Sequence, residues 1–317
     1  MLQSIRTRFR AYQLDSEGAS FSYFADPHFT LIEARLNDVN YRTLRHELRE
    51  CGKERIDTLH ITSWDADHCA TGDLERILSE FCPSKIEYPG YEPHCGQASD
   101  CLDIVKRYEK GKRGQTSGVV CQRIDPAYIA KLGAAEGYGY RDIFYHPTFI
   151  SESCNNDNST VKLFRRGSFN VASLGDVESV GISAYLKQSR IFCGETDVMI
   201  LAHHGADNGF TTSGFLKHSN PTIAICSSNY DNKFEHPRQD IRDLLYKQDI
   251  PIFTTKTGDV IVESIEGHRV RYRVVNLISG SEKVSSTTIF ASKKSDYLRN
   301  NADSIRNRAK PGFKGLK

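Results

Sequence analysis

Residues 62–68 read Thr-Ser-Trp-Asp-Ala-Asp-His and close the short apolar stretch Ile56–Thr62. We predict a strand over that stretch, so Asp65, Asp67 and His68 lie within four positions in the turn that leaves it. Carboxylate oxygens and an imidazole nitrogen are ligands that suit Zn²⁺, Mn²⁺ and Fe²⁺. The turn therefore predicts a metal site. Taken alone, it could instead be a capping turn for the helix that follows.

Three later positions repeat the arrangement of an Asp or His directly after a predicted strand. They are Asp176, the pair His203 and His204, and His236, which precedes Pro237. A single residue of this kind is more often structural than functional. Four such positions in one chain indicate an α/β sandwich that assembles a site at the carboxyl edges of its strands.

The surrounding chain alternates between strand and helix patterns. Arg8–Gln13 alternates as a strand does, whereas Asn40–Cys51 places Leu44 and Leu48 four residues apart among charged ones. That spacing is typical of an amphipathic helix. Asp73–Phe81 is predicted as the next helix. The alternation favours an α/β fold, and we assign residues 1–280 to one hydrolase domain.

Residues from about 82 to 150 are less regular, and we interpret them as an insertion or elaborated loop beside the core. This region holds a basic run that includes Lys110, Lys112 and Arg113. A surface excursion without function is the alternative. Five Cys and His residues in the region have no spacing typical of a zinc site, so ordinary buried thiols are expected there.

The composition is that of a globular, cytoplasmic protein. Of 317 residues, 38% are hydrophobic and 10% aromatic, and the longest apolar stretches are strand-sized. A membrane helix needs roughly 20 apolar residues, so no membrane partner is expected. The first ten residues lack an apolar signal core. The nine cysteines show no CxxC spacing, which fits reduced thiols in a cytoplasm.

Positive charge is concentrated at the end of the chain. The formal net charge of the whole chain is +2, but residues 281–317 alone hold nine Lys or Arg residues against three acidic ones, a net charge of +6. We treat residues 281–317 as a basic C-terminal tail. It is either an arm that binds nucleic acid, since neutralised phosphates release counterions, or a solvated extension that docks a protein partner.

The order of these motifs resembles the metallo-β-lactamase superfamily, specifically its ComEC/Rec2-like branch. The branch's series runs from Asp-x-Asp-His through Asn-x-x-Ser, here Asn156–Ser159, to Gly-Asp, His-His-Gly and His-Pro. The resemblance covers roughly Arg8–Ser264, with residues 82–150 matched least. It implies a four-layer αββα sandwich.

One departure concerns the metal. Ser63 stands where the first motif of the branch carries its leading His. In the superfamily that His helps hold one of two ions, so the resemblance implies that the first ion site is weakened or lost. A single Zn²⁺ or Mn²⁺ would then be held by Asp67, His68, Asp176 and either His204 or His236. Asp65 would assist a second, loosely held ion.

The activity implied by the resemblance is hydrolysis, in which a divalent ion lowers the pKa of its water from about 15.7 towards about 7. Asp67 would bind the ion or accept the proton of that water, and His203 or His204 would protonate the leaving oxygen. The branch favours single-stranded DNA as substrate and so a phosphodiesterase or nuclease. Candidate DNA contacts are Lys110, Lys112, Arg113 and Arg238.

Two other functions stay open. The same fold hydrolyses small lactones, thioesters and phosphate esters, so a small-molecule hydrolase is the nearest rival. Ser63 also allows a degenerate module that binds or regulates without catalysis. The intact Asp67, His68, Asp176 and paired His argue against that second alternative.

Overall fold

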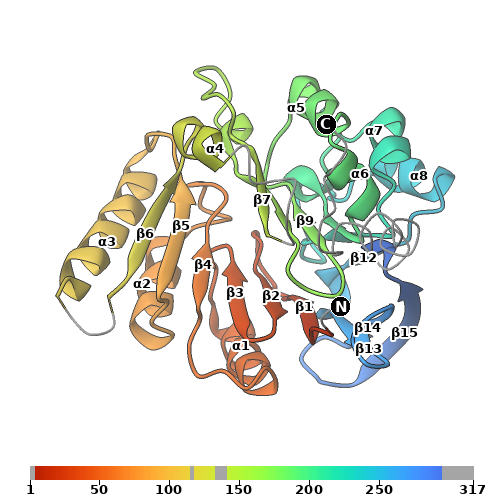
Figure 1. Cartoon of the computed structure of the whole chain (residues 1–317), viewed down its shortest axis with the longest axis horizontal. Helices are drawn as coiled ribbons and strands as arrows, with labels where there is room; N and C mark the ends of the chain where they lie inside the picture. The colour runs from red at the N-terminus through yellow and green to blue at the C-terminus, as the bar shows by residue number, and fades with distance from the viewer. Residues whose placement is uncertain (1–3, 115–117, 133–140, 295–317) are drawn as a thin grey trace, which may run out of the picture.

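Two β-sheets lie face to face at the centre of the molecule (Figure 1). The computed structural model describes residues 4–114, 118–132 and 141–294. Within them, the larger sheet has nine strands in the order β15-β14-β13-β1-β2-β3-β4-β5-β6, and the smaller has six in the order β12-β11-β10-β9-β8-β7.

The strands of the nine-stranded sheet are β1 (Thr7–Ala11), β2 (Phe21–Ala25), β3 (His28–Ile32), β4 (Thr58–His60), β5 (Lys85–Pro89), β6 (Val120–Ile124), β13 (Val260–Ile265), β14 (Arg271–Leu277) and β15 (Val284–Ala291). Those of the six-stranded sheet are β7 (Ile143–His146), β8 (Val161–Phe164), β9 (Val171–Ser173), β10 (Val198–Ile200), β11 (Ile223–Cys226) and β12 (Ile252–Thr254).

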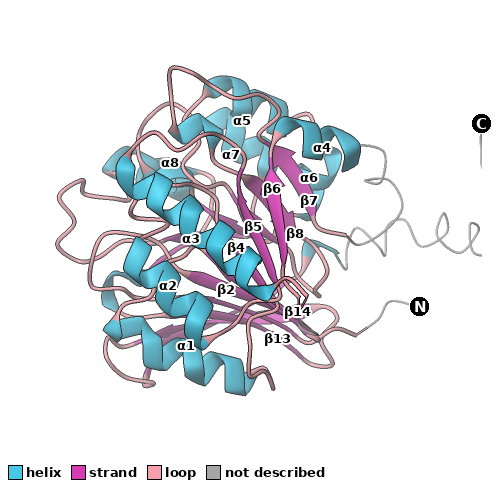
Figure 2. Ribbon diagram, turned by 90° about the vertical axis from the view of Figure 1, so that its left-hand side faces the viewer, coloured by secondary structure: helices cyan, strands magenta, loops and turns pink. Residues whose placement is uncertain are grey.

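Helices cover the outer face of each sheet, as Figure 2 shows for the side of the nine-stranded one. On that sheet lie α1 (Asp38–Glu50), α2 (Thr71–Glu80) and α3 (Gly96–Lys112). On the six-stranded sheet lie α5 (Val180–Leu186), α6 (Arg190–Glu195), α7 (Ser213–Ser219) and α8 (Gln239–Lys247), while the short α4 (Pro126–Leu132) contacts β6 and β7.

Three layers of apolar side chains hold these four layers together. One cluster packs α1–α3 onto the nine-stranded sheet, a second packs α5–α8 onto the six-stranded sheet, and a third fills the space between the sheets. The alternation of side chains along a strand supplies both apolar faces of the nine-stranded sheet. In β1, Phe9 faces the other sheet, whereas its neighbour Arg10 faces α1 and forms an ion pair with Glu47 at 3.2 Å. The expected four-layer αββα sandwich is confirmed.

Strand direction brings the ends of the two sheets to one edge. β3, β4, β5 and β6 run parallel to one another, and so do β9, β10, β11 and β12. In open α/β sheets, sites lie outside the carboxyl ends of such strands. The turns after β4, β9, β10 and β11 are therefore the places to look for a site.

The region that we expected to be an insertion contributes strands to both sheets. Residues 82–150 supply β5 and β6 at one end of the nine-stranded sheet and β7 at the end of the six-stranded one. The first part of the basic tail forms β15, and residues 295–317 lie outside the described residues. None of the helices in the described part of the chain is both long and apolar enough to cross a membrane.

Candidate metal centre

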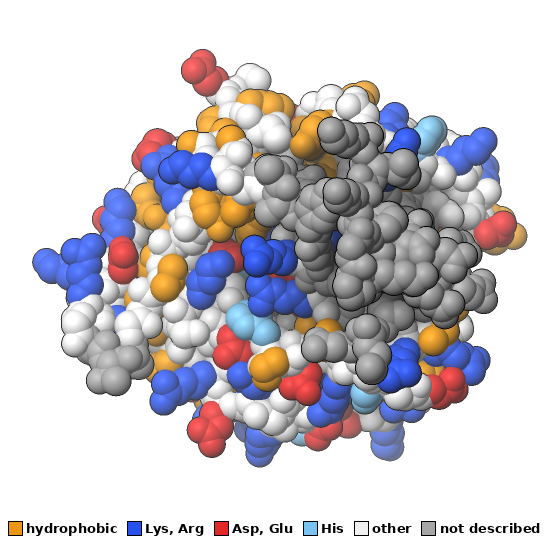
Figure 3. Space-filling model, in the orientation of Figure 1, with side chains coloured by type: hydrophobic (Ala, Val, Ile, Leu, Met, Phe, Trp, Pro, Cys, Tyr) orange, Lys and Arg blue, Asp and Glu red, His pale blue; other side chains and the backbone are white. Residues whose placement is uncertain are grey.

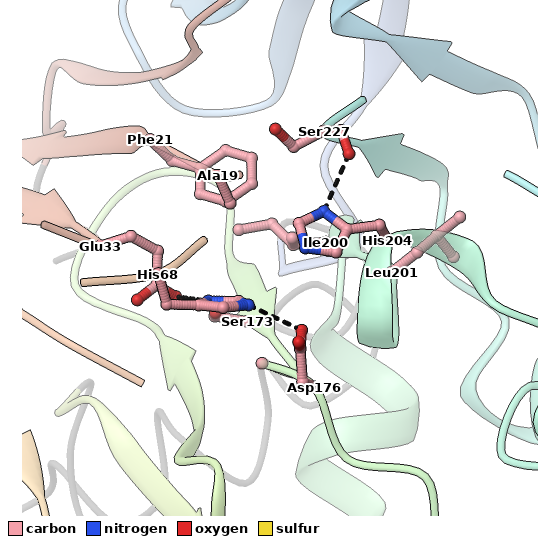
Figure 4. Close-up of a pocket in the computed structure, with 11 residues that line it drawn as sticks. Ala19, Phe21, Glu33, His68, Ser173, Asp176, Ile200, Leu201, His204 and Ser227 are labelled. Atoms are coloured by element: carbon pink, nitrogen blue, oxygen red, sulfur yellow. Dashed lines mark hydrogen bonds and ion pairs between the residues drawn. The ribbon is translucent and has the colours of Figure 1, made fainter. Parts of the chain in front are cut away.

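Four side chains from three strand ends meet at this edge. Asp67 and His68 follow β4, Asp176 follows β9, and His204 lies in the turn after β10. One potential ligand atom from each lies within 4.8 Å of the others, as a metal site requires. Figure 4 shows His68, Asp176 and His204 around one small cavity. Sequence reasoning left His204 and His236 as alternatives, and the structure places His204 in this cluster.

A glycine lets the two sheets approach here. Gly175 has a φ of +54°, and a Cβ at that position would lie 2.8 Å from the Cβ of Ser159 and 3.2 Å from the Oγ1 of Thr62. The backbone N–H of Thr160 also donates to the carbonyl of Thr62 at 2.9 Å. Gly175 thus places the next residue, Asp176, against the turn after β4, since a larger residue would separate them.

Each of the two histidines turns its Nε2 towards one of the two carboxylates. The Nδ1 of His204 donates to the carbonyl of Ser227 at 2.9 Å, and its Nε2 hydrogen-bonds to Asp67 Oδ2 at 3.2 Å. The Nε2 of His68 lies 2.9 Å from Asp176 Oδ1, yet this buried contact lacks hydrogen-bond geometry. Two imidazole nitrogens and two carboxylates that face one another in this way can share a cation, whether protons or a metal ion.

Glu33 orients His68 from behind. Its Oε1 is 3.3 Å from the Nδ1 of His68, and its carboxylate also accepts the N–H of Thr62 at 3.0 Å and its hydroxyl at 2.6 Å. A carboxylate behind a ligating imidazole fixes the tautomer and raises the basicity of the ligand. Sequence reasoning missed Glu33, although it follows β3 and so obeys the same rule as the four predicted positions.

The charges of the cluster are strongly coupled. Burial alone would raise the pKa of Asp67, but the facing His68 and His204 lower it below its usual range. Burial alone would lower the pKa of His68, but Asp176, Asp67 and Glu33 raise it well above its ordinary value. The carboxylates are therefore ionised, and protons on the two rings balance them. A divalent ion bound here would replace those protons.

Asp65, the residue that we expected to assist a second ion, is held by contacts with other side chains. The hydroxyl of Ser63 donates to Asp65 Oδ2 at 2.6 Å and lies 3.0 Å from the hydroxyl of Tyr91. The other oxygen of Asp65 is 3.2 Å from the Nε2 of His94. Asp65 is thus held by protein partners and does not belong to the four-residue cluster.

His203 and His236 lie beside the cluster. The Nδ1 of His203 is 2.6 Å from Glu178 Oε1, and Asn156 donates to the same oxygen at 2.8 Å. The ring of His236 stacks on that of His204, with centroids 6.3 Å apart and planes at 8°. Burial, followed by the charges of His204 and His203, lowers the pKa of His236 to about 4. Glu178 was also missed from sequence.

A second, more open pocket adjoins the cluster. It is lined by Asp67, His203, His204 and His236, together with Ser227, Asn229, Asn232 and Phe234. It encloses about 400 Å³, counting the solvent at its mouth. Because this pocket is open to solvent and lies beside the candidate ligands, a substrate can reach them through it.

The basic residues singled out from sequence lie in two places. Arg238 is next to this pocket, and its N–H donates to the carbonyl of Gly205 at 3.0 Å. Lys110, Lys112 and Arg113 lie at the C-terminal end of α3, which joins β5 to the parallel β6. They are therefore at the amino ends of these strands, opposite the candidate metal ligands. Figure 3 shows that positive side chains are spread over one face of the molecule, with acidic ones among them.

Comparison with known proteins gives one sequence relative. No family model matches the chain. Over 215 residues, or 66% of the chain, it is 24% identical to ComE operon protein 3 of Bacillus subtilis (strain 168) and covers 25% of that protein. The chain thus spans about a quarter of the length of this curated relative.

Solved structures of metallo-hydrolases overlap with most of the chain. Igni18, a metallo hydrolase from Ignicoccus hospitalis KIN4/I, is 17% identical with a TM-score of 0.48, over 81% of this chain and 98% of that one. A diphosphatase from the PhnP family is 14% identical with a TM-score of 0.39, over 78% and 86%. Both TM-scores are below 0.5, a level at which overlap establishes no shared function.

The sequence relative agrees with the features of the molecule itself. Two sheets between helical layers, and Asp and His ligands at the strand ends in the order of the motifs, are what the resemblance implied. The chain is a four-layer αββα sandwich and is similar in sequence to ComE operon protein 3, in agreement with the resemblance to the ComEC/Rec2-like branch of the metallo-β-lactamase superfamily.

Proposed function

We propose that this chain is a metal-dependent phosphodiesterase that cleaves single-stranded DNA. The observation that carries the proposal is the convergence of Asp67, His68, Asp176 and His204 within 4.8 Å. Two carboxylates and two imidazoles are a ligand set for Zn²⁺ or Mn²⁺. Such an ion acts as a Lewis acid and lowers the pKa of its water towards about 7.

We propose a single ion rather than two. The hydroxyl of Ser63 and the ring of His94 hold the Asp65 carboxylate on both oxygens, so that carboxylate is not free to bind metal. His236 stacks on His204 rather than joining the cluster, which leaves four ligands for one ion.

The residues around the ligands supply the proton transfers. Asp67 lines the open pocket, so the carboxylate oxygen that does not bind the ion can accept a proton from the water that attacks phosphorus. In its doubly protonated form, His203 donates its Nδ1–H to Glu178 and carries a second proton on Nε2. As the new P–O bond forms and the old one breaks, His203 gives a proton to the leaving oxygen.

DNA is favoured as substrate by the resemblance to the competence branch, which the match to ComE operon protein 3 supports. The pocket beside the ligands is open to small molecules as well, so a small-molecule hydrolase is the second candidate. The two differ in what should compete for the site. A nuclease is inhibited by single-stranded DNA, whereas a small-ester hydrolase is indifferent to it.

A direct test uses the full chain with Zn²⁺ or Mn²⁺, an end-labelled single-stranded oligonucleotide and bis(p-nitrophenyl) phosphate. Wild type should cleave both, and His203→Ala should lower kcat by about 10²–10⁴-fold. His218→Ala, at the exposed end of α7, is the matched control and should keep full activity. Equal activity of His203→Ala and wild type would contradict the mechanism. Absence of cleavage by metal-loaded wild type would contradict the function.

A further inference from the structure

A ladder of rings leads from a metal ligand to the surface. His204 stacks on His236 with planes at 8°, and His236 stacks in turn on Phe234, with centroids 5.6 Å apart and planes at 22°. Phe234 is 52% exposed, so the ladder ends in solvent with an aromatic ring. The near-parallel planes mean that another flat ring can continue the stack beyond Phe234.

The segment that carries Phe234 is held in place. It spans residues 229–238 and joins β11 to α8 at the carboxyl end of β11, on the same edge as the metal ligands. The side chain of Asn232 donates to the carbonyls of Asn229 (3.1 Å) and His236 (3.0 Å), and it accepts the N–H of His236 at 2.6 Å. Because these bonds fix the segment before any ligand arrives, little ordering is needed on binding.

The surroundings of Phe234 suit a nucleotide. The ammonium of Lys233 is 4.8 Å from the centre of the Phe234 ring and 2.9 Å from Glu17 across the pocket mouth. It is largely exposed, so it can turn towards a phosphate. Asn229 lines the pocket as well and offers an amide to a polar ring edge. An aromatic ring beside a cation is how many proteins hold single-stranded nucleic acid.

We propose that the 229–238 segment is a nucleobase subsite, in which Phe234 stacks on the base of a nucleotide next to the phosphate that is cleaved. This inference rests on the proposed function and adds that the substrate must carry a nucleobase. Since every base has a flat π face, the subsite recognises the presence of a base rather than its identity. Lys233 contacts the adjoining phosphate.

The test separates base from backbone. A fluorescein-labelled hexamer of deoxythymidylate is compared with an abasic hexamer of the same length and charge, and binding to the full chain is measured by fluorescence anisotropy without added metal. Wild type should bind the thymidylate hexamer about tenfold more tightly. Contacts to phosphate by the basic tail act equally on both probes and cancel in the ratio.

Three variants sharpen the result. Phe234→Ala should bring the ratio of the two Kd values to about one. Phe234→Leu keeps apolar area but not the ring and should fall between, whereas Phe234→Trp should retain the preference. Tyr246→Ala, which removes an aromatic ring that is 83% exposed on α8, is the control and should leave the ratio unchanged.

A wild-type ratio of about one, or a preference that survives Phe234→Ala, would overturn the subsite. These outcomes are independent of catalysis, because the probes report binding alone. If the chain binds bases through Phe234 but cleaves neither the oligonucleotide nor bis(p-nitrophenyl) phosphate, the subsite stands and the proposed function fails. If it cleaves both substrates and shows no base preference, the proposed function stands and the subsite fails.

Discussion

Two buried aspartates lie at opposite edges of the six-stranded sheet. Asp176 follows β9, with its Oδ1 2.9 Å from His68 Nε2. Asp197 precedes the parallel β10 and accepts the backbone N–H groups of Asn170 at 2.9 Å and Lys293 at 2.8 Å. The carboxylate of Asp176 therefore faces an imidazole nitrogen with which it can share a cation. The carboxylate of Asp197 instead links the residues after β15 to the residue before β9 through backbone hydrogen bonds.

Their acid–base behaviour differs accordingly. Burial tends to raise the pKa of both carboxyls, but the charge of His68 lowers that of Asp176 below its usual value. The two N–H bonds of Asp197 are not enough to offset its burial, and its pKa is raised to about 7. Depth alone does not mark a functional carboxylate. What marks it is the kind of group that its oxygens meet.

The largest effect is expected from Asp176→Asn. This variant keeps the size of the side chain but removes the charge that faces His68, so metal affinity should fall by more than about 100-fold and hydrolysis should cease. Elemental analysis of the purified protein and the phosphodiester assay measure both. Asp197→Asn is the matched control and should keep its metal. Equal metal content in the two variants would remove the distinction drawn between the aspartates.

Glu33→Gln tests the carboxylate behind His68. The amide still accepts a hydrogen bond from Thr62, but it no longer fixes the charge and tautomer of His68. We expect metal affinity to fall about 10–100-fold. Activity should return at saturating metal, because no ligand is lost. A competition titration with a chelator measures the affinity, and an unchanged value would show that Glu33 serves folding alone.

The pKa of Asp197 sets a pH dependence of stability. Its ordinary value is 3.8 and its value in the folded protein is about 7, so between these limits the folded state holds more protons than the unfolded one. The free energy of unfolding that it contributes is therefore present below pH 4 and is lost as pH rises towards 7, by up to about 1.4 kcal/mol per pH unit.

Asp197→Asn does not titrate and lacks this slope. Urea denaturation of both proteins at several pH values between 4 and 7 should show wild type losing stability relative to the variant as pH rises. Profiles that run parallel would mean that Asp197 is ionised in the folded protein throughout this range.

Much of the fold and the ligand cluster could be predicted because both depend on strand direction. An Asp or His directly after a strand is visible in the sequence, and parallel strands bring such positions together. Asp67, His68 and Asp176 were found in this way. Glu33 obeys the same rule, but in Leu-Ile-Glu-Ala-Arg it is indistinguishable from one charge of an amphipathic stretch.

Other features depend on geometry that no local pattern encodes. The choice between His204 and His236 depends on a left-handed turn, in which His203 and His204 have φ values of 44° and 52°. The basic run at Lys110 stays a predicted DNA contact. Its charge is visible in the sequence, but its position at the C-terminal end of α3, near the amino ends of β5 and β6, is not. Residues 82–150 looked irregular because their strands are separated by long helices and loops.

The smallest effect, and the sharpest test of the single-ion proposal, is expected from Ser63→His. Ser63 is fully buried and links Tyr91 to Asp65, so a larger ring there should cost about 1–3 kcal/mol of stability.

The same change releases Asp65 from the hydroxyl and adds an imidazole beside it. Metal content should then rise from about one ion per chain towards two, since Asp65 and the new ring together offer a second set of ligands. Elemental analysis, with thermal denaturation alongside, measures both changes. If the content stays at one while the protein remains folded, then His94 and Tyr91, and not the loss of a histidine at position 63, keep the second position closed.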